Sequence, residues 1–173
     1  MERRFFTVML GLLFYAISAF PDNIDWEYDP HAYQYDMTVY VGLQVDGTSV
    51  QDLSRYTVAA FYNDECRGIV EKKTIGNYSY GYLRIRSNKS QGESITFKVY
   101  DTQTGKMAKC NHSIEFLSQD VAGLPSSPFI IEAYNLYKVN FVADEHIIEA
   151  SFYYGDPILQ PDAPEKEGYT FIG

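Results

Sequence analysis

The chain has 173 residues, a formal net charge of −9, and 16 Tyr and 11 Phe beside a single Trp. An acidic chain lacks the basic footprint that replaces counterions on phosphate, which argues against nucleic acids and anionic membrane surfaces as partners. Tyr and Phe favour pleated strands, as do the many Val, Ile and Thr residues, so the composition predicts an all-β protein.

The first 19 residues have the three-part layout of a secretory signal peptide. Arg3 and Arg4 precede an apolar run over 5–15, and small residues follow at 16–19. The apolar run is about ten residues long, whereas a membrane span needs roughly 20. Residues 1–19 are therefore predicted to be removed on export, which leaves a mature chain with a net charge of −10 and no transmembrane segment. We expect the protein at the cell surface or in the extracellular space.

Residues 37–45 (MTVYVGLQV) alternate between apolar and other side chains at every position, which predicts a strand with one buried face. Asp46-Gly47 then supplies turn chemistry. Further strand-like runs separated by short polar gaps predict an antiparallel β-sandwich (Ig-like) over residues 20–133. These runs are Tyr56–Tyr62, Arg67–Lys72, Tyr80–Arg86, Ile95–Tyr100 and Phe129–Glu132. The best helical candidate, 113–121, is too short to hold three turns.

After a boundary at about 133–136, alternation resumes and predicts a hairpin over 137–154 that turns near Asp144-Glu145. The stretch LYKVNFVADEHIIEASFYYGDPILQPDAPEKEGYTFIG resembles the Listeria–Bacteroides repeat, or internalin B-repeat. The resemblance implies a β-grasp-like unit whose signature continues with a Trp after the last Gly. Residues 137–173 are therefore expected to be the first half of a truncated repeat, incomplete without its closing strands.

The front unit resembles an ECRG-type β-sandwich module of exported Bacteroidetes proteins, through YTVAAFYNDECRGIV and GESITFKVYDTQTGK. In that pattern a turn and its exit are formed by Asp64, Glu65, Cys66, Arg67 and Gly68. Turns need short polar residues and a Gly for their backbone angles, so this motif is interpreted as structural and not catalytic.

The sequence offers little catalytic chemistry. His31, His112 and His146 are isolated, and no CxxC, GxSxG, Walker or GxGxxG pattern occurs, so we predict no enzyme, cofactor or metal site. The acidic stretch around Trp26 could supply oxygen ligands for Ca²⁺ but lacks EF-hand spacing, which favours a solvated arm. Export favours a disulfide between the two cysteines, Cys66 and Cys110. The resembled module suggests no partner for Cys110, so pairing stays open.

Aromatic residues cluster near the N-terminus and suggest a ligand-binding platform made of Trp26, Tyr28, Tyr33 and Tyr35. Tyr78, Tyr80 and Tyr82 alternate along one strand face and could form either a core ladder or a second platform. We expect a non-catalytic exported protein of cell-surface adhesion or interaction, built from a binding module and a repeat stalk. The alternative is a carbohydrate-binding module of a glycan-degrading system. The expected partner is a host or bacterial surface protein or a glycan.

Overall fold

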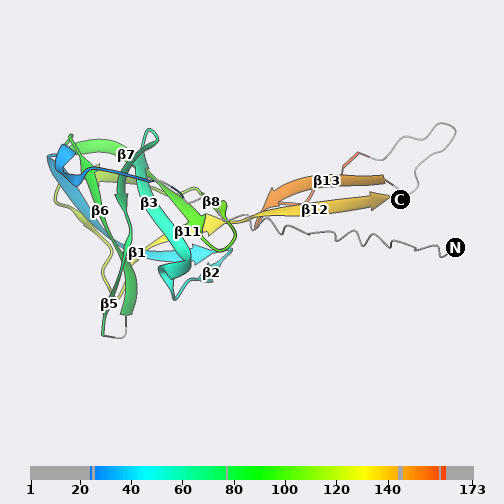
Figure 1. Ribbon diagram of the computed structural model, residues 1–173, viewed down its shortest axis with the longest axis horizontal. Helices are drawn as coiled ribbons and strands as arrows, with labels where there is room; N and C mark the ends of the chain where they lie inside the picture. Colours follow the sequence, from blue (N-terminus) through cyan, green and yellow to red (C-terminus); the bar gives the residue numbers. More distant parts are fainter. Residues whose placement is uncertain (1–23, 25, 77, 144–145, 160, 163–173) are drawn as a thin grey trace, which may run out of the picture.

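The computed structural model describes residues 24, 26–76, 78–143, 146–159 and 161–162. They form a β-rich body, from which a two-stranded hairpin extends (Figure 1). The body contains β1 (Tyr35–Val45), β2 (Thr48–Ser49), β3 (Tyr56–Tyr62), β4 (Glu65–Ile69), β5 (Glu71–Ile75), β6 (Tyr78–Ser87), β7 (Gln91–Asp101), β8 (Lys106–Cys110), β9 (Ser113–Leu117), β10 (Val121–Ala122) and β11 (Phe129–Tyr134). The hairpin consists of β12 (Leu136–Ala143) and β13 (His146–Tyr153), and two 3-10 turns are η1 (Pro30–Ala32) and η2 (Leu53–Arg55). The predicted signal peptide 1–19 and the end of the predicted repeat, 163–173, lie outside the described residues.

The central strand β1 follows the predicted alternation. Its apolar side chains at every second position are almost fully buried, with exposures of 0–8%, while the intervening residues are only partly covered. At the end of the strand, Asp46 and Gly47 adopt positive φ angles of 51° and 74°, as expected for the turn into β2. The periodic pattern and the turn dipeptide therefore fix this element locally.

The strands of the body hydrogen-bond in the order β4-β3-β7-β8-β11-β1-β6-β5, with β2 and β10 added to β1 and β9 added to β7. The predicted purely antiparallel arrangement is wrong, because β1 pairs in parallel with β11 over Val41–Val45 and with β10 at Thr38 and Val39. Parallel neighbours need a long connection, and here most of the body separates the two partners in sequence. The sheet is therefore mixed.

The core lies between the two halves of this sheet, which face each other. Apolar side chains of β1, β6 and β11 meet those of β3, β7, β8 and β9 in one buried cluster. The most completely buried large side chains are Phe116, Met37, Leu83, Ile85, Ile95 and Ile131. Phe116 belongs to β9, within the segment 113–121 that is the best helical candidate of the sequence; this segment forms β9 and ends at the first residue of β10 instead.

The predicted hairpin is present, and its two strands pair antiparallel from Leu136–Tyr153 to Ala143–His146. Asp46, at the tip of the β1–β2 turn, joins it to the body. The Asp46 carboxylate accepts hydrogen bonds from the backbone N–H of Asn135 (2.9 Å), from Asn135 Nδ2 (2.8 Å) and from the Tyr137 hydroxyl (2.7 Å). The hairpin is thus attached through a side-chain network in addition to the chain itself.

Candidate functional site

The N-terminal arm, residues 26–34, crosses the outer face of β3 and β4. Trp26 meets Phe61 edge to face, with ring centroids 5.3 Å apart, and Tyr28 packs on the same small cluster. Together with their neighbours they line a shallow hollow of about 510 Å³, formed by Trp26, Glu27, Tyr28, Asp29 and Ile69. Two of the four predicted platform aromatics therefore lie side by side at a surface hollow with an acidic rim.

The other two predicted platform residues lie elsewhere. The Tyr33 hydroxyl donates a 2.6 Å hydrogen bond to Glu65 Oε1, and the Arg67 guanidinium lies 4.9 Å from the centre of the Tyr33 ring. Burial, followed by the bond to Glu65, raises the pKa of Tyr33 to about 12. Tyr35 packs against the main core. The four aromatics do not form one continuous platform.

The ECRG segment forms a turn and the strand that leaves it. Asn63 and Asp64 have positive φ angles of 47° and 65°, and the Asp64 carboxylate pairs with Lys98 Nζ at 2.9 Å. Gly68 lies so close to β6 that a Cβ there would overlap the Arg84 carbonyl oxygen. The glycine is required for close packing of β4 on β6 and not for a turn angle.

Arg67 connects three parts of the body at one end of the core. Its side chain is 8% exposed and lies 3.6 Å from the Glu93 carboxylate, which is 4% exposed and accepts a 2.7 Å hydrogen bond from the Ser87 hydroxyl. The guanidinium also lies over the Tyr62 ring, and its Nη1 donates to the Arg86 carbonyl oxygen. Its Nε has no partner among the described residues. Arg67 is thus an internal cation, held between two tyrosine rings.

Cys66 and Cys110 are both free thiols, so the candidate disulfide between them is not present. Cys66 belongs to the outer cluster under the arm, whereas Cys110 packs against the main core between the sheet halves. Burial raises the pKa of both thiols, which disfavours their thiolate forms. The two residues therefore belong to separate apolar clusters.

The tyrosines of β6 form a ladder on the outer face of the sheet. Tyr40 of β1 contacts Tyr80 and Tyr82 edge to face, with centroid separations of 5.4 and 6.0 Å. Tyr80 is 5% exposed and Tyr82 is half-buried, so this group is closer to a packed ladder than to an open platform. The side chain of Tyr78 lies outside the described residues.

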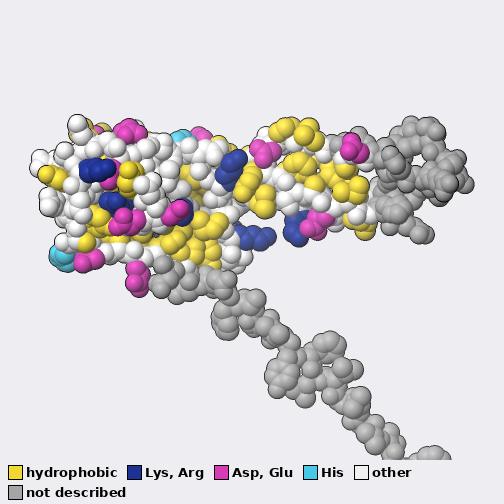
Figure 2. Space-filling model, turned by 90° about the horizontal axis from the view of Figure 1, so that it is seen from above, with side chains coloured by type: hydrophobic (Ala, Val, Ile, Leu, Met, Phe, Trp, Pro, Cys, Tyr) yellow, Lys and Arg dark blue, Asp and Glu magenta, His cyan; other side chains and the backbone are white. Residues whose placement is uncertain are grey.

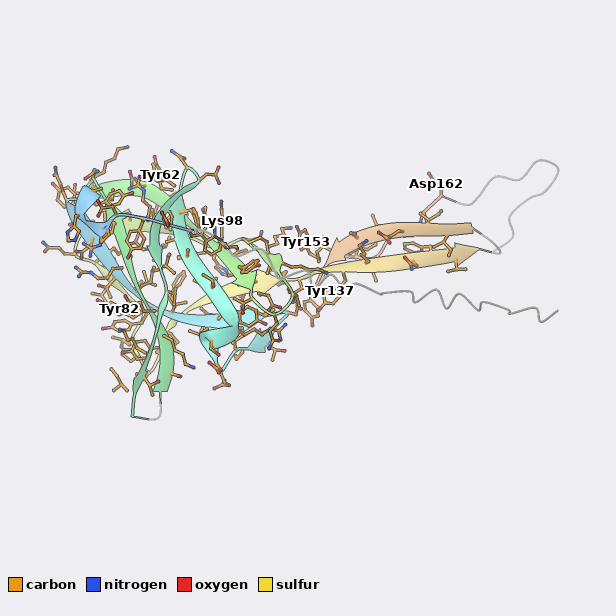
Figure 3. All side chains as sticks on the ribbon, viewed as in Figure 1. Tyr62, Tyr82, Lys98, Tyr137, Tyr153 and Asp162 are labelled. Carbon is orange, nitrogen blue, oxygen red and sulfur yellow. The ribbon has the colours of Figure 1, made fainter. Side chains whose placement is uncertain are left out.

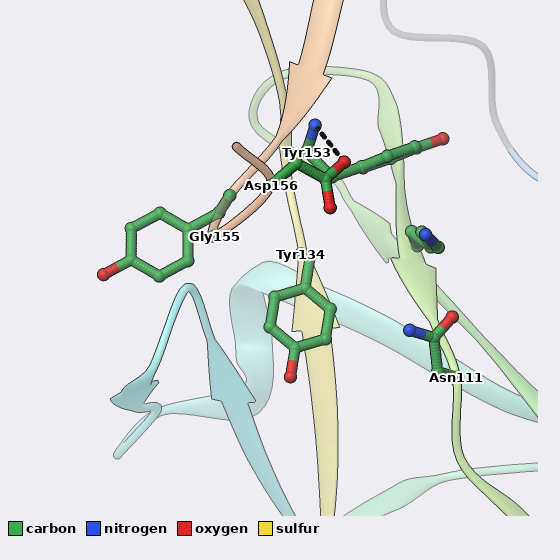
Figure 4. A pocket seen from close by; sticks show the side chains of 7 residues that line it. Asn111, Tyr134, Tyr153, Gly155 and Asp156 are labelled. Carbon is green, nitrogen blue, oxygen red and sulfur yellow. Dashed lines mark hydrogen bonds between the residues drawn. The ribbon is translucent and has the colours of Figure 1, made fainter. Parts of the chain in front are cut away.

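A second hollow, which the sequence did not indicate, lies where the hairpin meets the body, and we call it the junction pocket (Figure 4). It has a volume of about 280 Å³ and is lined by Lys109, Asn111, Tyr134, Tyr153, Tyr154, Gly155 and Asp156. Tyr134 and Asn111 reach it from the body, while Tyr153 and Asp156 come from the hairpin (Figure 4). Its residues come from three separate stretches of the sequence between Lys109 and Asp156, so no local motif could have revealed it.

Only some of the polar side chains at the junction pocket make hydrogen bonds to other described residues. Lys109 Nζ lies 4.9 Å from the centre of the Tyr153 ring, and Asp156 accepts a 3.2 Å hydrogen bond from the Tyr153 N–H. The Tyr134 hydroxyl donates to Glu132 at 2.9 Å. The Asn111 amide makes no side-chain hydrogen bond to another described residue, and Tyr154 is 50% exposed. The pocket therefore offers aromatic faces together with available donors and acceptors.

Across the described parts of the chain, no three His, Cys, Asp or Glu side chains approach one another as a metal-binding group would. In the same residues, no helix has the length and apolar character needed to cross a membrane. No protein-family model matches the chain, and neither the curated proteins nor the solved structures include a significant match.

Proposed function

We propose that the protein is a non-catalytic, exported surface protein of adhesion or interaction, and that the hairpin is its main contact surface. In this proposal residues 20–133 are an Ig-like sandwich of the ECRG type. Residues 137–173 are the first half of a β-grasp-like Listeria–Bacteroides repeat. The resemblance in sequence supports both assignments, and the mixed β-rich body and the hairpin are compatible with them.

The observation that carries the proposal is the apolar face of the hairpin. Residues opposite each other in an antiparallel pair share a face, and three consecutive pairs of this kind are apolar on both strands. We call this set the apolar hairpin face: Tyr137–Phe152, Val139–Ala150 and Phe141–Ile148. The opposite face is mixed and includes an ion pair between Lys138 and Glu149 at 2.7 Å. The hairpin therefore has one side suited to burial.

The body does not bury this face completely. Tyr137 is 50% exposed and Ile148 is 40% exposed, and Tyr137 lies at the junction, from which the hairpin runs outward (Figure 3). Hydrophobic side chains are prominent over the hairpin in the space-filling view (Figure 2). Contiguous exposed apolar surface of this kind marks contact sites for proteins. A protein surface on a host or bacterial cell fits it better than a glycan does.

The experiment measures retention of the fluorescently labelled full chain on a cultured epithelial cell layer and on intact cells of the producing bacterium. The test variant, Phe141→Ser with Ile148→Ser, changes one cross-strand pair of the apolar hairpin face. The matched control, Val142→Ser with Ile147→Ser, changes the neighbouring pair on the opposite face, where both side chains are at least 65% exposed. Flow cytometry reports bound protein, and circular dichroism checks that both variants fold.

We expect saturable retention that the test variant loses and the control variant keeps. Each lost apolar contact of this size contributes about 1.5–3 kcal/mol when fully buried, so affinity should fall by at least about tenfold. Equal retention by the two variants would refute the role of this face. Absence of saturable binding on both cell types would refute adhesion itself.

A further inference from the structure

We propose that the junction pocket binds one neutral pyranose unit of a glycan. The pocket is independent of the apolar hairpin face, because none of its lining residues belongs to that face. Its volume of about 280 Å³ is just below the roughly 300–1,000 Å³ of drug-sized small-molecule sites. That size favours a single ring over an extended chain.

Aromatic surface is the first requirement of such a ligand. A pyranose presents patches of C–H groups on its ring faces, which pack on the negative face of an aromatic ring. Three tyrosines, Tyr134, Tyr153 and Tyr154, are among the residues that line this hollow. Tyr154 is half-exposed, so its side chain is accessible to a ligand.

Hydrogen-bonding groups are the second requirement, because each sugar hydroxyl that leaves water needs a new partner. Asn111 provides both a donor and an acceptor, Lys109 provides donors and Asp156 provides acceptors. Of these three side chains, Asp156 alone makes a hydrogen bond to another described residue, and that bond comes from one N–H. A carboxylate has further acceptor capacity for a ligand hydroxyl.

The charges around the pocket select against ionic ligands. An anion would face Asp156, with Glu132 close behind through its bond from Tyr134 and only Lys109 to offset them. A cation that sought the Tyr153 ring would meet Lys109, whose ammonium group already lies 4.9 Å from the ring centre. A neutral polyol avoids both conflicts.

The pocket is also pre-organised, which lowers the entropic cost of binding a small ligand. Its two sides belong to different elements, and the three hydrogen bonds from Asn135 and Tyr137 to Asp46 fasten the base of the hairpin to the β1–β2 turn of the body. The Tyr154 N–H donates to the Asn135 carbonyl oxygen at 3.0 Å, and the Tyr154 ring lies beside Gly47 of the same turn. The hairpin side of the pocket is therefore held in place against the body.

The test titrates the ¹⁵N-labelled full chain with the methyl pyranosides of glucose, galactose, mannose and N-acetylglucosamine, and with glycerol as a non-cyclic polyol. We expect at least one pyranoside to shift the backbone amides of 109, 111, 134 and 154–156 saturably, with a Kd on the order of 1 mM, and glycerol to leave them unchanged. The variants Asn111→Ala and Tyr154→Ala alter accessible side chains. Each should weaken binding by about fivefold to tenfold.

Two controls separate this site from its neighbours. Trp26→Ala, in the arm hollow, should leave pyranoside binding unchanged, and so should the double variant of the apolar hairpin face. Saturable shifts that centre on residues 26–29, or that survive both junction variants, would overturn the assignment. So would the absence of saturable shifts with every pyranoside. Retention on cells is measured with different variants, so failure of adhesion and failure of the sugar site give different results.

Discussion

Replacing Arg67 by Met should destabilise the body strongly, because the change leaves the Glu93 carboxylate buried without its cation. The Glu93 side chain is only 4% exposed, and the Ser87 hydroxyl would be its remaining hydrogen-bond donor among the described side chains. Breaking a buried ion pair from one side costs about 3–5 kcal/mol. For a chain of this size each kcal/mol lowers Tm by about 2–4 °C, so the midpoint should fall by about 6–20 °C.

A double variant tests whether the stranded Glu93 charge causes this loss of stability. Adding Glu93→Gln to Arg67→Met removes the stranded charge while keeping an oxygen that can accept from Ser87, so most of the lost stability should return. Arg84→Met is the matched control, because Arg84 is 42% exposed and pairs with Asp36 at the surface. Its loss should be no more than about 1 kcal/mol.

Urea unfolding followed by far-ultraviolet circular dichroism gives the free energies, and fluorescence of the single tryptophan reports the same transition near the arm. A cost for Arg67→Met as small as that for Arg84→Met would refute the importance of the internal cation. A double variant as unstable as the single one would show that the stranded Glu93 charge is not the cause.

Three further predictions concern close packing, pH and the junction. Gly68→Ala should cost at least about 1–3 kcal/mol in urea unfolding, because its Cβ would overlap the Arg84 carbonyl oxygen; an unchanged midpoint would contradict this contact. Hydrogen bonds from Arg55 lower the pKa of Asp101 from 3.8 to about 2, so their stabilisation is complete above about pH 4 and is lost as pH falls toward 2. The stability difference between wild type and Arg55→Ala should therefore shrink across that range, and a constant difference would be evidence against the pair. Asp46→Ala should speed amide hydrogen exchange at 135 and 154 while the β1 amides change little. Unchanged exchange at 135 and 154 would show that the hydrogen bonds to Asp46 do not hold the base of the hairpin.

Sequence reasoning predicts the strands best where one face is buried and the other is open. The alternation over 37–45 corresponds to a strand with closely matching bounds, since a period of two determines which side chains face the core. The run Tyr56–Tyr62 also matches its strand, although residues 58–61 are buried on both faces, and there the β-favouring composition carries the prediction. The segment 113–121 was harder to interpret, because Ser113–Leu117 buries one large residue, Phe116, and its other apolar positions are partly or fully exposed. A strand with so little buried surface has a weak periodic signal.

The pairing of strands that are distant in the sequence cannot be predicted from local periodicity. Nothing in the residues of β1 distinguishes a parallel neighbour from an antiparallel one, yet β11 joins it in parallel. Arg67 shows the same limit for a single side chain. Arginine is rarely buried, and the ECRG pattern was interpreted as a turn and its exit, so the contacts with Glu93 and Tyr33 were not predicted.

Asp46 has two structural roles, one in its own turn and one in contacts with residues far away in the sequence. A turn with positive φ at this position accepts Asp or Asn about equally well, so the sequence explains Asp46 by its turn alone. The partners of its side chain are donors: the N–H and amide nitrogen of Asn135 and the Tyr137 hydroxyl. An ionised carboxylate accepts all three, whereas an Asn would have only one accepting atom and would bring two N–H donors of its own. An isolated hairpin is marginal in water, so its fixed attachment depends on contacts of this kind with the body. Asp46 therefore forms the β1–β2 turn through its backbone, and its carboxylate anchors the base of the hairpin, which carries one side of the junction pocket.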